Sequence, residues 1–169
     1  MRNPIVRRIT ENAIVAALYF ALVAASIPLS FGMIQVRIAE FLVLLCFFRK
    51  DFIFGVTAGT LLANIFSTML PWDLLFGTLA TLIAATGVAF CRHLLVAAFI
   101  PVVVNGFIVG AELVVFAGVE EAYMLCVAFV AAGEAIAVIG IGYTLMMILK
   151  RQQGFMELIG ANQNLEAKW

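Results

Sequence analysis

The feature of this sequence that most constrains its fold is a series of six long apolar segments. They lie at residues 9–27, 36–48, 52–70, 74–90, 94–116 and 123–149. A helix crosses the hydrocarbon core of a bilayer with about 20 mainly apolar residues, and only the second segment is much shorter than this. The apolar runs are continuous rather than alternating, which excludes a membrane β-barrel. We therefore predict an all-α membrane protein with six transmembrane helices.

The composition agrees with a lipid environment and excludes other classes of protein. Hydrophobic residues make up 65% of the 169 residues and charged residues only 12%, which is too little to cover a soluble surface. Ten basic residues balance ten acidic residues, so no positive excess is present for binding nucleic acid. The three cysteines have no metal-binding or redox spacing, and we interpret them as small core residues.

The positions of the basic residues predict the orientation in the membrane. Cytoplasmic loops are rich in lysine and arginine, and with six spans all but one of the basic residues fall on the same side. These residues are Arg2, Arg7, Arg8, Arg49, Lys50, Arg92, Lys150, Arg151 and Lys168. We expect cytoplasmic N- and C-termini, a membrane domain at 1–150 and a cytoplasmic tail at 151–169. The alternative for the first segment is a cleaved secretory signal, although its apolar run is longer than a typical signal core.

Polar residues inside the spans are the candidate binding residues. A charge near the membrane centre costs about 2.5 to 3.5 kcal/mol on insertion scales, so each needs a partner or a water-filled space. The candidates are Arg37, Glu40, Asn64, Asp73, Asn105, Glu112 and Glu134. All lie in the outer half of the membrane under the predicted topology. They predict a cup that is open to the outside and closed beneath.

The charge of this cup indicates its ligand. Four acidic residues oppose Arg37 alone, which favours a ligand with a cation or several hydrogen-bond donors. Simpler roles remain open for some members. Arg37 and Glu40 are three residues apart and could form an ion pair that secures a helix end. Asp73 could cap a helix N-terminus, and Glu112 could extend outward to water.

The first span carries a stripe of small residues on one face. Ala13, Ala17, Ala21 and Ala25 recur at every fourth position. Such a stripe allows another helix to approach closely, either within this chain or from a partner protein.

The segments SFGMIQVRIAEFLVLL and WDLLFGTLATLIA resemble the QueT family of S components, the substrate-binding subunits of energy-coupling factor (ECF) transporters. Gln35, Arg37 and Glu40 match its Q-x-R-x-x-E arrangement, and residues 59–64 and Asp73 also fit its pattern. The resemblance covers residues 10–149 and is most specific at 30–84.

The resemblance implies a function without catalysis or bound metal. A member of this family would capture a queuosine precursor, such as 7-aminomethyl-7-deazaguanine or queuine, at the plasma membrane of a prokaryote. It would hold no cofactor itself and would work with a transmembrane scaffold protein (the T component) and two ATPase subunits, and those two subunits would use ATP. Ala13, Ala17 and Ala21 would contact that scaffold, and residues 28–35 would form an outer gate.

The chemistry of such a ligand suggests roles for the polar residues, and Asn105, Glu112 and Glu134 are included for their positions in the spans rather than for the resemblance. Glu40 and Glu134 would bind the ring edge or amine, and Asp73 would lie at the rim. Gln35 and Arg37 would bind the carbonyl, and Asn64 and Asn105 the remaining ring atoms. Aromatic residues that could stack on the ring are Phe31, Phe66, Trp72 and Phe76.

Three other functions remain alternatives. The first is an S component for a different vitamin-like molecule. The second is a carrier that works alone, although the inner halves of the spans lack the acids of a proton path. The third is an intramembrane enzyme, which the single histidine, His93, disfavours because it lies among cytoplasmic basic residues, far from the acidic cup.

Overall fold

The computed structural model describes residues 4–30, 35–116, 118 and 122–160, and within these ranges it contains helices and no β-strand. Two of the helices, η1 and η2, are 3₁₀-helical, and η3 and η4 are π-helical. The elements are α1 (Pro4–Ala25), α2 (Ile27–Ser30), η1 (Ile38–Leu44), α3 (Leu45–Phe48), α4 (Phe52–Ala63), η2 (Asn64–Phe66), η3 (Asp73–Gly77), α5 (Thr78–Phe90), α6 (Leu94–Phe116), α7 (Tyr123–Glu134), η4 (Ala135–Tyr143), α8 (Thr144–Leu149) and α9 (Gln153–Ile159). The predicted all-α class is therefore confirmed.

Four continuous helical stretches are long and apolar enough to cross a membrane. They are Pro4–Ala25, Asp73–Phe90, Leu94–Phe116 and Tyr123–Leu149. Ile38–Phe48 and Phe52–Phe66 are apolar but shorter. A multi-pass membrane protein follows from this pattern, whereas the count of six crossings and the orientation stay predictions.

The third predicted span ends earlier than expected. We predicted helix to Leu70, but the chain leaves the helix after Phe66 and Ser67 is extended, with φ −67° and ψ 142°. Pro71 disfavours helical backbone at Leu70, the residue to which we expected the helix to extend. The first helix also differs, because it begins at Pro4 rather than at Ile9.

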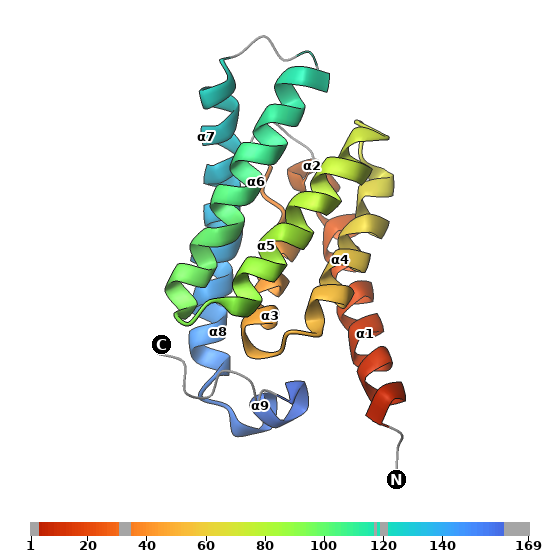
Figure 1. Cartoon of the computed structure of the whole chain (residues 1–169), viewed down its shortest axis with the longest axis vertical. Helices are drawn as coiled ribbons and strands as arrows, with labels where there is room; N and C mark the ends of the chain where they lie inside the picture. Colours follow the sequence, from red (N-terminus) through yellow and green to blue (C-terminus); the bar gives the residue numbers. More distant parts are fainter. Residues whose placement is uncertain (1–3, 31–34, 117, 119–121, 161–169) are drawn as a thin grey trace.

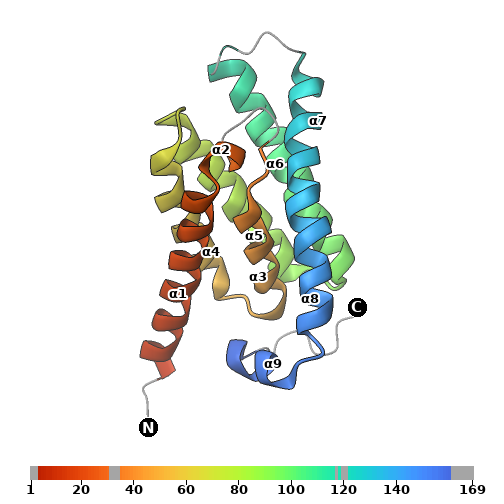
Figure 2. The ribbon, with the colours of Figure 1, turned by 180° about the vertical axis from the view of Figure 1, so that it is seen from behind.

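The helices form two packed pairs around a central short helix. α1 packs along α4, and α6 packs along α7, with α5 against both α4 and α6 (Figures 1 and 2). The η1–α3 segment lies between them, and every residue from Leu42 to Arg49 is buried. This central position brings the start of η1 close to residues from several spans.

Two glycines allow the close approaches that build this arrangement. A Cβ atom at Gly59 would lie 2.7 Å from the Tyr19 Cβ and 2.9 Å from the Ala16 carbonyl oxygen, so the backbone of α4 packs directly against α1 there. A Cβ atom at Gly133 would lie 2.4 Å from the Gln35 carbonyl oxygen. Gly133 thus lets the extended segment before η1 lie directly on α7.

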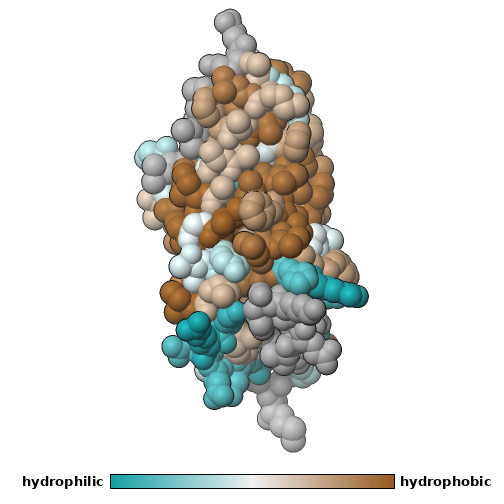
Figure 3. Space-filling model, turned by 90° about the vertical axis from the view of Figure 1, so that its left-hand side faces the viewer, coloured by the Kyte–Doolittle hydropathy of each residue, from teal (hydrophilic) through white to brown (hydrophobic). Residues whose placement is uncertain are grey.

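The outer surface of the molecule divides into apolar and polar parts. The face drawn in Figure 3 is apolar along the body of the bundle and hydrophilic toward the end that carries α9. Large side chains such as Phe54, Phe90 and Val115 are exposed on the helices, at 75%, 67% and 67%. This distribution suits helices that face lipid.

Candidate functional site

The eight predicted binding residues are all buried, with exposed fractions from 0% for Glu40 to 5% for Gln35. They come from several elements that the fold brings together. Gln35 and Arg37 precede η1, Glu40 lies in η1, Asn64 opens η2, Asp73 opens η3, Asn105 and Glu112 lie in α6, and Glu134 ends α7.

Arg37 and Asp73 form the centre of one group. The Arg37 Nη2 and Asp73 Oδ1 atoms are 3.9 Å apart. Asn64 Nδ2 donates to the Asp73 carbonyl oxygen at 2.8 Å, and Ser67 Oγ donates to Asp73 Oδ2. Gly77 leaves room for this group, because a Cβ there would be 3.0 Å from Asn64 Nδ2 and 3.7 Å from Arg37 Nη1.

These contacts decide between alternatives that the sequence left open. Asp73 does not cap its helix, because Trp72 occupies the cap position and no side-chain cap hydrogen bond forms there. Its side chain instead contacts Ser67 and Arg37. The Glu112 side chain does not extend to water either, because it is buried at 2% exposure.

Glu40 is held by residues from two other helices. Tyr19 on α1 donates its hydroxyl to Glu40 Oε1, and Thr81 Oγ1 lies 3.5 Å from the same oxygen. Tyr19 is completely buried. The sequence reasoning missed Tyr19 and Ser67; the signal for Tyr19 was a hydroxyl on the face of the first span opposite the alanine stripe.

Glu134 and Asn105 form the deeper group. Asn105 Nδ2 donates to Glu134 Oε1 at 2.8 Å, which joins α6 to α7. Glu134 also interacts electrostatically with Glu40 and Arg37, and Glu112 interacts with Asp73 and Arg37. All four acids therefore belong to one connected polar cluster around Arg37.

Most of the spare hydrogen-bonding capacity in this cluster consists of acceptors. In the described part of the chain, seven buried oxygen atoms of the predicted binding residues have no hydrogen-bond partner. They are Glu40 Oε2, Asn64 Oδ1, Asp73 Oδ1, Asn105 Oδ1, Glu112 Oε1, Glu112 Oε2 and Glu134 Oε2. A buried polar atom without a partner costs about 1 to 3 kcal/mol. A ligand that donates several hydrogen bonds would remove much of this cost.

Aromatic residues border the cluster where η3 meets the end of α6. The Trp72 ring stacks on Phe116 with centroids 3.9 Å apart, and Phe76 lies 5.4 Å from Phe116. Phe66 instead contacts Phe20 at 5.4 Å. Phe31 falls outside the described residues.

Other predicted features are only partly described. Residues 31–34 of the predicted gate and residues 161–169 of the predicted tail, with Lys168, lie outside the described ranges. Ala13, Ala17 and Ala21 are exposed on one face of α1, so this stripe does not pack inside the described part of the chain. Its contact with a partner stays a prediction.

Comparison with known proteins gives two matches. The model of a family described as QueT transporter matches residues 9–151. The protein named Queuosine precursor transporter QueT, from Lactococcus lactis subsp. cremoris (strain MG1363), is 40% identical over 78 residues. That alignment covers 44% of this chain and 45% of the relative, so the match spans less than half of the relative's length. No solved structure matches the chain.

Proposed function

Because the chain belongs to the QueT transporter family, we propose that it is the S component of an ECF importer and captures a queuosine precursor outside the cell. The name of the Lactococcus relative supports the same class of substrate. The observation that carries the proposal is the set of buried acceptor oxygens on Glu40, Asp73, Glu112 and Glu134 that have no hydrogen-bond partner among the described residues. The protein itself catalyses no reaction in this proposal.

The chemistry of a 7-deazaguanine suits this set of acceptors. Its guanine-like edge presents N–H donors that one carboxylate can accept in two parallel hydrogen bonds. An aminomethyl substituent adds a cation, which a second carboxylate would bind. We assign the ring edge to Glu134 or Glu40, which lie in one electrostatically coupled group.

The remaining polar residues complete the proposed site. Asp73 and Glu112 interact with each other and would bind the amine near the rim. Arg37 and Gln35 supply donors for the ring carbonyl. Asn64 and Asn105 each have an amide oxygen without a hydrogen-bond partner in the described structure, and these oxygens would accept from the remaining ring N–H groups.

Energy for transport would come from partner subunits. In this proposal residues 1–150 form the membrane substrate-binding domain and 151–169 a cytoplasmic tail. A scaffold protein would contact Ala13, Ala17 and Ala21, whose exposure on α1 supports this role. Two ATPase subunits would bind and hydrolyse ATP, and this chain would need no cofactor or metal.

Calorimetric titration of the purified protein tests the proposal. The ligands are 7-aminomethyl-7-deazaguanine and queuine, with guanine, riboflavin and thiamine for comparison. We expect tight binding of the deazaguanines only, and the ratio of their affinities reports whether the aminomethyl cation is recognised. Binding of riboflavin or thiamine instead would reassign the substrate. A folded protein that binds none of the five would contradict the proposal and favour a carrier that works alone.

A further inference from the structure

A cavity lies beside the start of α1, at the end of the molecule that carries α9. Its volume is about 520 Å³, within the usual range for ligand sites. Residues at the start of α1, in the connection between α3 and α4, and after α9 line it, among them Arg7, Arg8, Arg49, Lys50 and Gly160. Four of its lining residues are basic and two, Glu11 and Asp51, are acidic. The lining is therefore positively charged.

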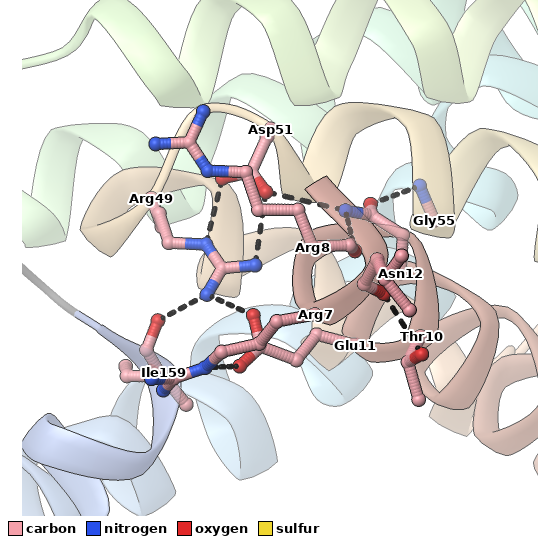
Figure 4. Close-up of polar contacts among 10 residues, drawn as sticks. Arg7, Arg8, Thr10, Glu11, Asn12, Arg49, Asp51, Gly55 and Ile159 are labelled. Atoms are coloured by element: carbon pink, nitrogen blue, oxygen red, sulfur yellow. Dashed lines mark hydrogen bonds and ion pairs between the residues drawn. The ribbon is translucent and has the colours of Figure 1, made fainter. Parts of the chain in front are cut away.

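Arg49 forms hydrogen bonds to three of the segments that surround this cavity (Figure 4). Its Nε donates to Asp51 Oδ1 at 2.6 Å, and its Nη1 donates to Glu11 Oε2 at 2.6 Å and to the Ile159 carbonyl oxygen at 2.8 Å. Burial opposes the charged form of Arg49, but the hydrogen bonds and charges of Asp51 and Glu11 outweigh it and raise the pKa of Arg49. Arg49 thus stays charged and joins α1 to the end of α9.

Arg7 and Arg8 supply the cationic groups that remain available to a ligand. Arg7 Nε donates to Glu11 Oε1 at 2.7 Å, and its two terminal nitrogens make no hydrogen bond to another residue that the structure describes. The Arg8 side chain extends from α1 toward the connection that carries Arg49 and Asp51, and no contact to its guanidinium is drawn (Figure 4). Arg8 has no ion pair within the described residues.

A second cavity of about 440 Å³ adjoins the basic one, and apolar residues line it together with Arg7, Thr10 and Glu11. The two cavities share Arg7 and Glu11 as lining residues. The second is bordered by Val6, Ile14 and Leu158, whose side chains are 54%, 61% and 70% exposed. The basic cavity therefore continues along α1 into a second cavity that exposed apolar side chains of α1 and α9 border.

We propose that these two cavities bind one anionic phospholipid, with its phosphate headgroup at Arg7 and Arg8 and an acyl chain along Ile14 and Leu158. The charge of the first cavity matches the headgroup of such a lipid, and the exposed apolar side chains of Val6, Ile14 and Leu158 at the second match its acyl chain. Basic pockets at the cytoplasmic ends of membrane helices suit acidic headgroups. The bound lipid would lie against α1 and α9 and is independent of the substrate at the polar cluster.

Native mass spectrometry of the full chain in detergent tests this site. The probes are dioleoylphosphatidylglycerol and dioleoylphosphatidylcholine, which share acyl chains and differ in net charge. We expect a preference for phosphatidylglycerol that falls about fivefold in Arg8→Gln, because a basic residue near an anionic surface contributes about 1 kcal/mol. Arg8→Lys should retain most of the preference. Arg92→Gln removes an exposed charge outside both cavities and should leave binding unchanged.

Several results would overturn the proposal. Equal binding of the two lipids would mean that the charge of the headgroup is not recognised. Equal losses in Arg8→Gln and Arg92→Gln would mean that only general surface charge attracts lipid. Displacement of phosphatidylglycerol by soluble glycerol 3-phosphate would indicate a phosphate site without a lipid. Lipid binding only after deletion of residues 161–169, which include Glu166, would assign the basic cavity to that segment of the chain itself.

Discussion

Glu134 is an acidic residue of the polar cluster that is buried and only partly hydrogen-bonded in the described structure. It lies at the end of α7, is 2% exposed, and receives one hydrogen bond from Asn105. Its second oxygen has no hydrogen-bond partner in the described structure. A carboxylate in this position gains more from a donor on a ligand than an exposed carboxylate would, because water cannot replace that donor.

Replacing Glu134 by glutamine should therefore weaken binding of 7-aminomethyl-7-deazaguanine. The change keeps the size of the side chain but puts an N–H₂ group where the ligand also offers N–H groups. Hydrogen bonds to charged groups contribute about 1.5 to 3 kcal/mol, so we expect an affinity loss of about 10- to 100-fold by calorimetry. Glu157→Gln on the exposed surface of α9 is the matched control. An unchanged affinity in a folded Glu134→Gln protein would remove this residue from the site.

The partner of Arg37 shows what could and could not be predicted at this scale. Burial of the polar residues followed from their positions within apolar segments. The spacing of Arg37 and Glu40 suggested a local ion pair, but Arg37 is extended, with φ −84° and ψ 92°, and precedes the helix that contains Glu40. Its ion pair is with Asp73 instead. That contact depends on tertiary packing, so the spacing of residues along the sequence does not predict it.

At the scale of elements, the two π-helical segments adjoin the polar cluster. Asp73 opens η3 and Glu134 immediately precedes η4. A π-helical turn contains extra residues, and such turns are frequent at functional sites. The apolar pattern predicted these segments correctly as helical. However, the α-helical repeat of 3.6 residues does not reveal where a turn contains an extra residue. The positions of these turns could not be read from the sequence for this reason.

The close contact between α1 and α4 at Gly59 predicts that one added methyl group there will lower the stability of the protein. A Cβ at Gly59 would be 2.7 Å from the Tyr19 Cβ and 2.9 Å from the Ala16 carbonyl oxygen. Gly59→Ala should therefore separate the helices and destabilise the protein by about 1 to 3 kcal/mol. Thermal unfolding in detergent, followed by circular dichroism, measures this loss.

Gly140→Ala is the control for that substitution. The nearest atom to a Cβ at Gly140 is the Ala135 carbonyl oxygen at 3.8 Å, which is an ordinary contact. It should leave the unfolding temperature the same or raise it, since alanine favours helix over glycine. Equal unfolding temperatures for the two variants would contradict the role of Gly59 in helix packing.

The exposed face of α1 leads to a prediction about assembly. Ala17 lies on this face, and a larger side chain there would hold a partner helix away. Ala17→Leu should leave affinity for 7-aminomethyl-7-deazaguanine unchanged but reduce copurification with the proposed scaffold and ATPase subunits. Ala132→Leu, at an exposed alanine on α7, is the matched control. Intact assembly of the Ala17→Leu protein would exclude the stripe as the docking surface.

At the scale of the whole molecule, the two ends differ in where their charges lie. One end has arginines at the surface, and Arg49 joins α1 to α9 there. In the other half of the molecule the acidic residues are buried around Arg37. This asymmetry was predictable, because it follows from which connections carry lysine and arginine. The short central helix was harder to place. Ile38–Phe48 extends roughly 20 Å, less than the thickness of a bilayer core.

The charge asymmetry predicts that residue 122 faces outward and residue 152 faces the cytoplasm. Both Ala122 and Gln152 are exposed, at opposite ends of the Tyr123–Leu149 helix. In a Cys91→Ser background, Ala122→Cys should react with a membrane-impermeant maleimide in intact cells. Gln152→Cys should react only after the cells are opened, because Lys150 and Arg151 keep that connection on the cytoplasmic side. Cys46 and Cys126 are buried and should stay unlabelled in both proteins. The opposite labelling pattern would invert the topology, and with it the proposal that the polar cluster receives its ligand from outside.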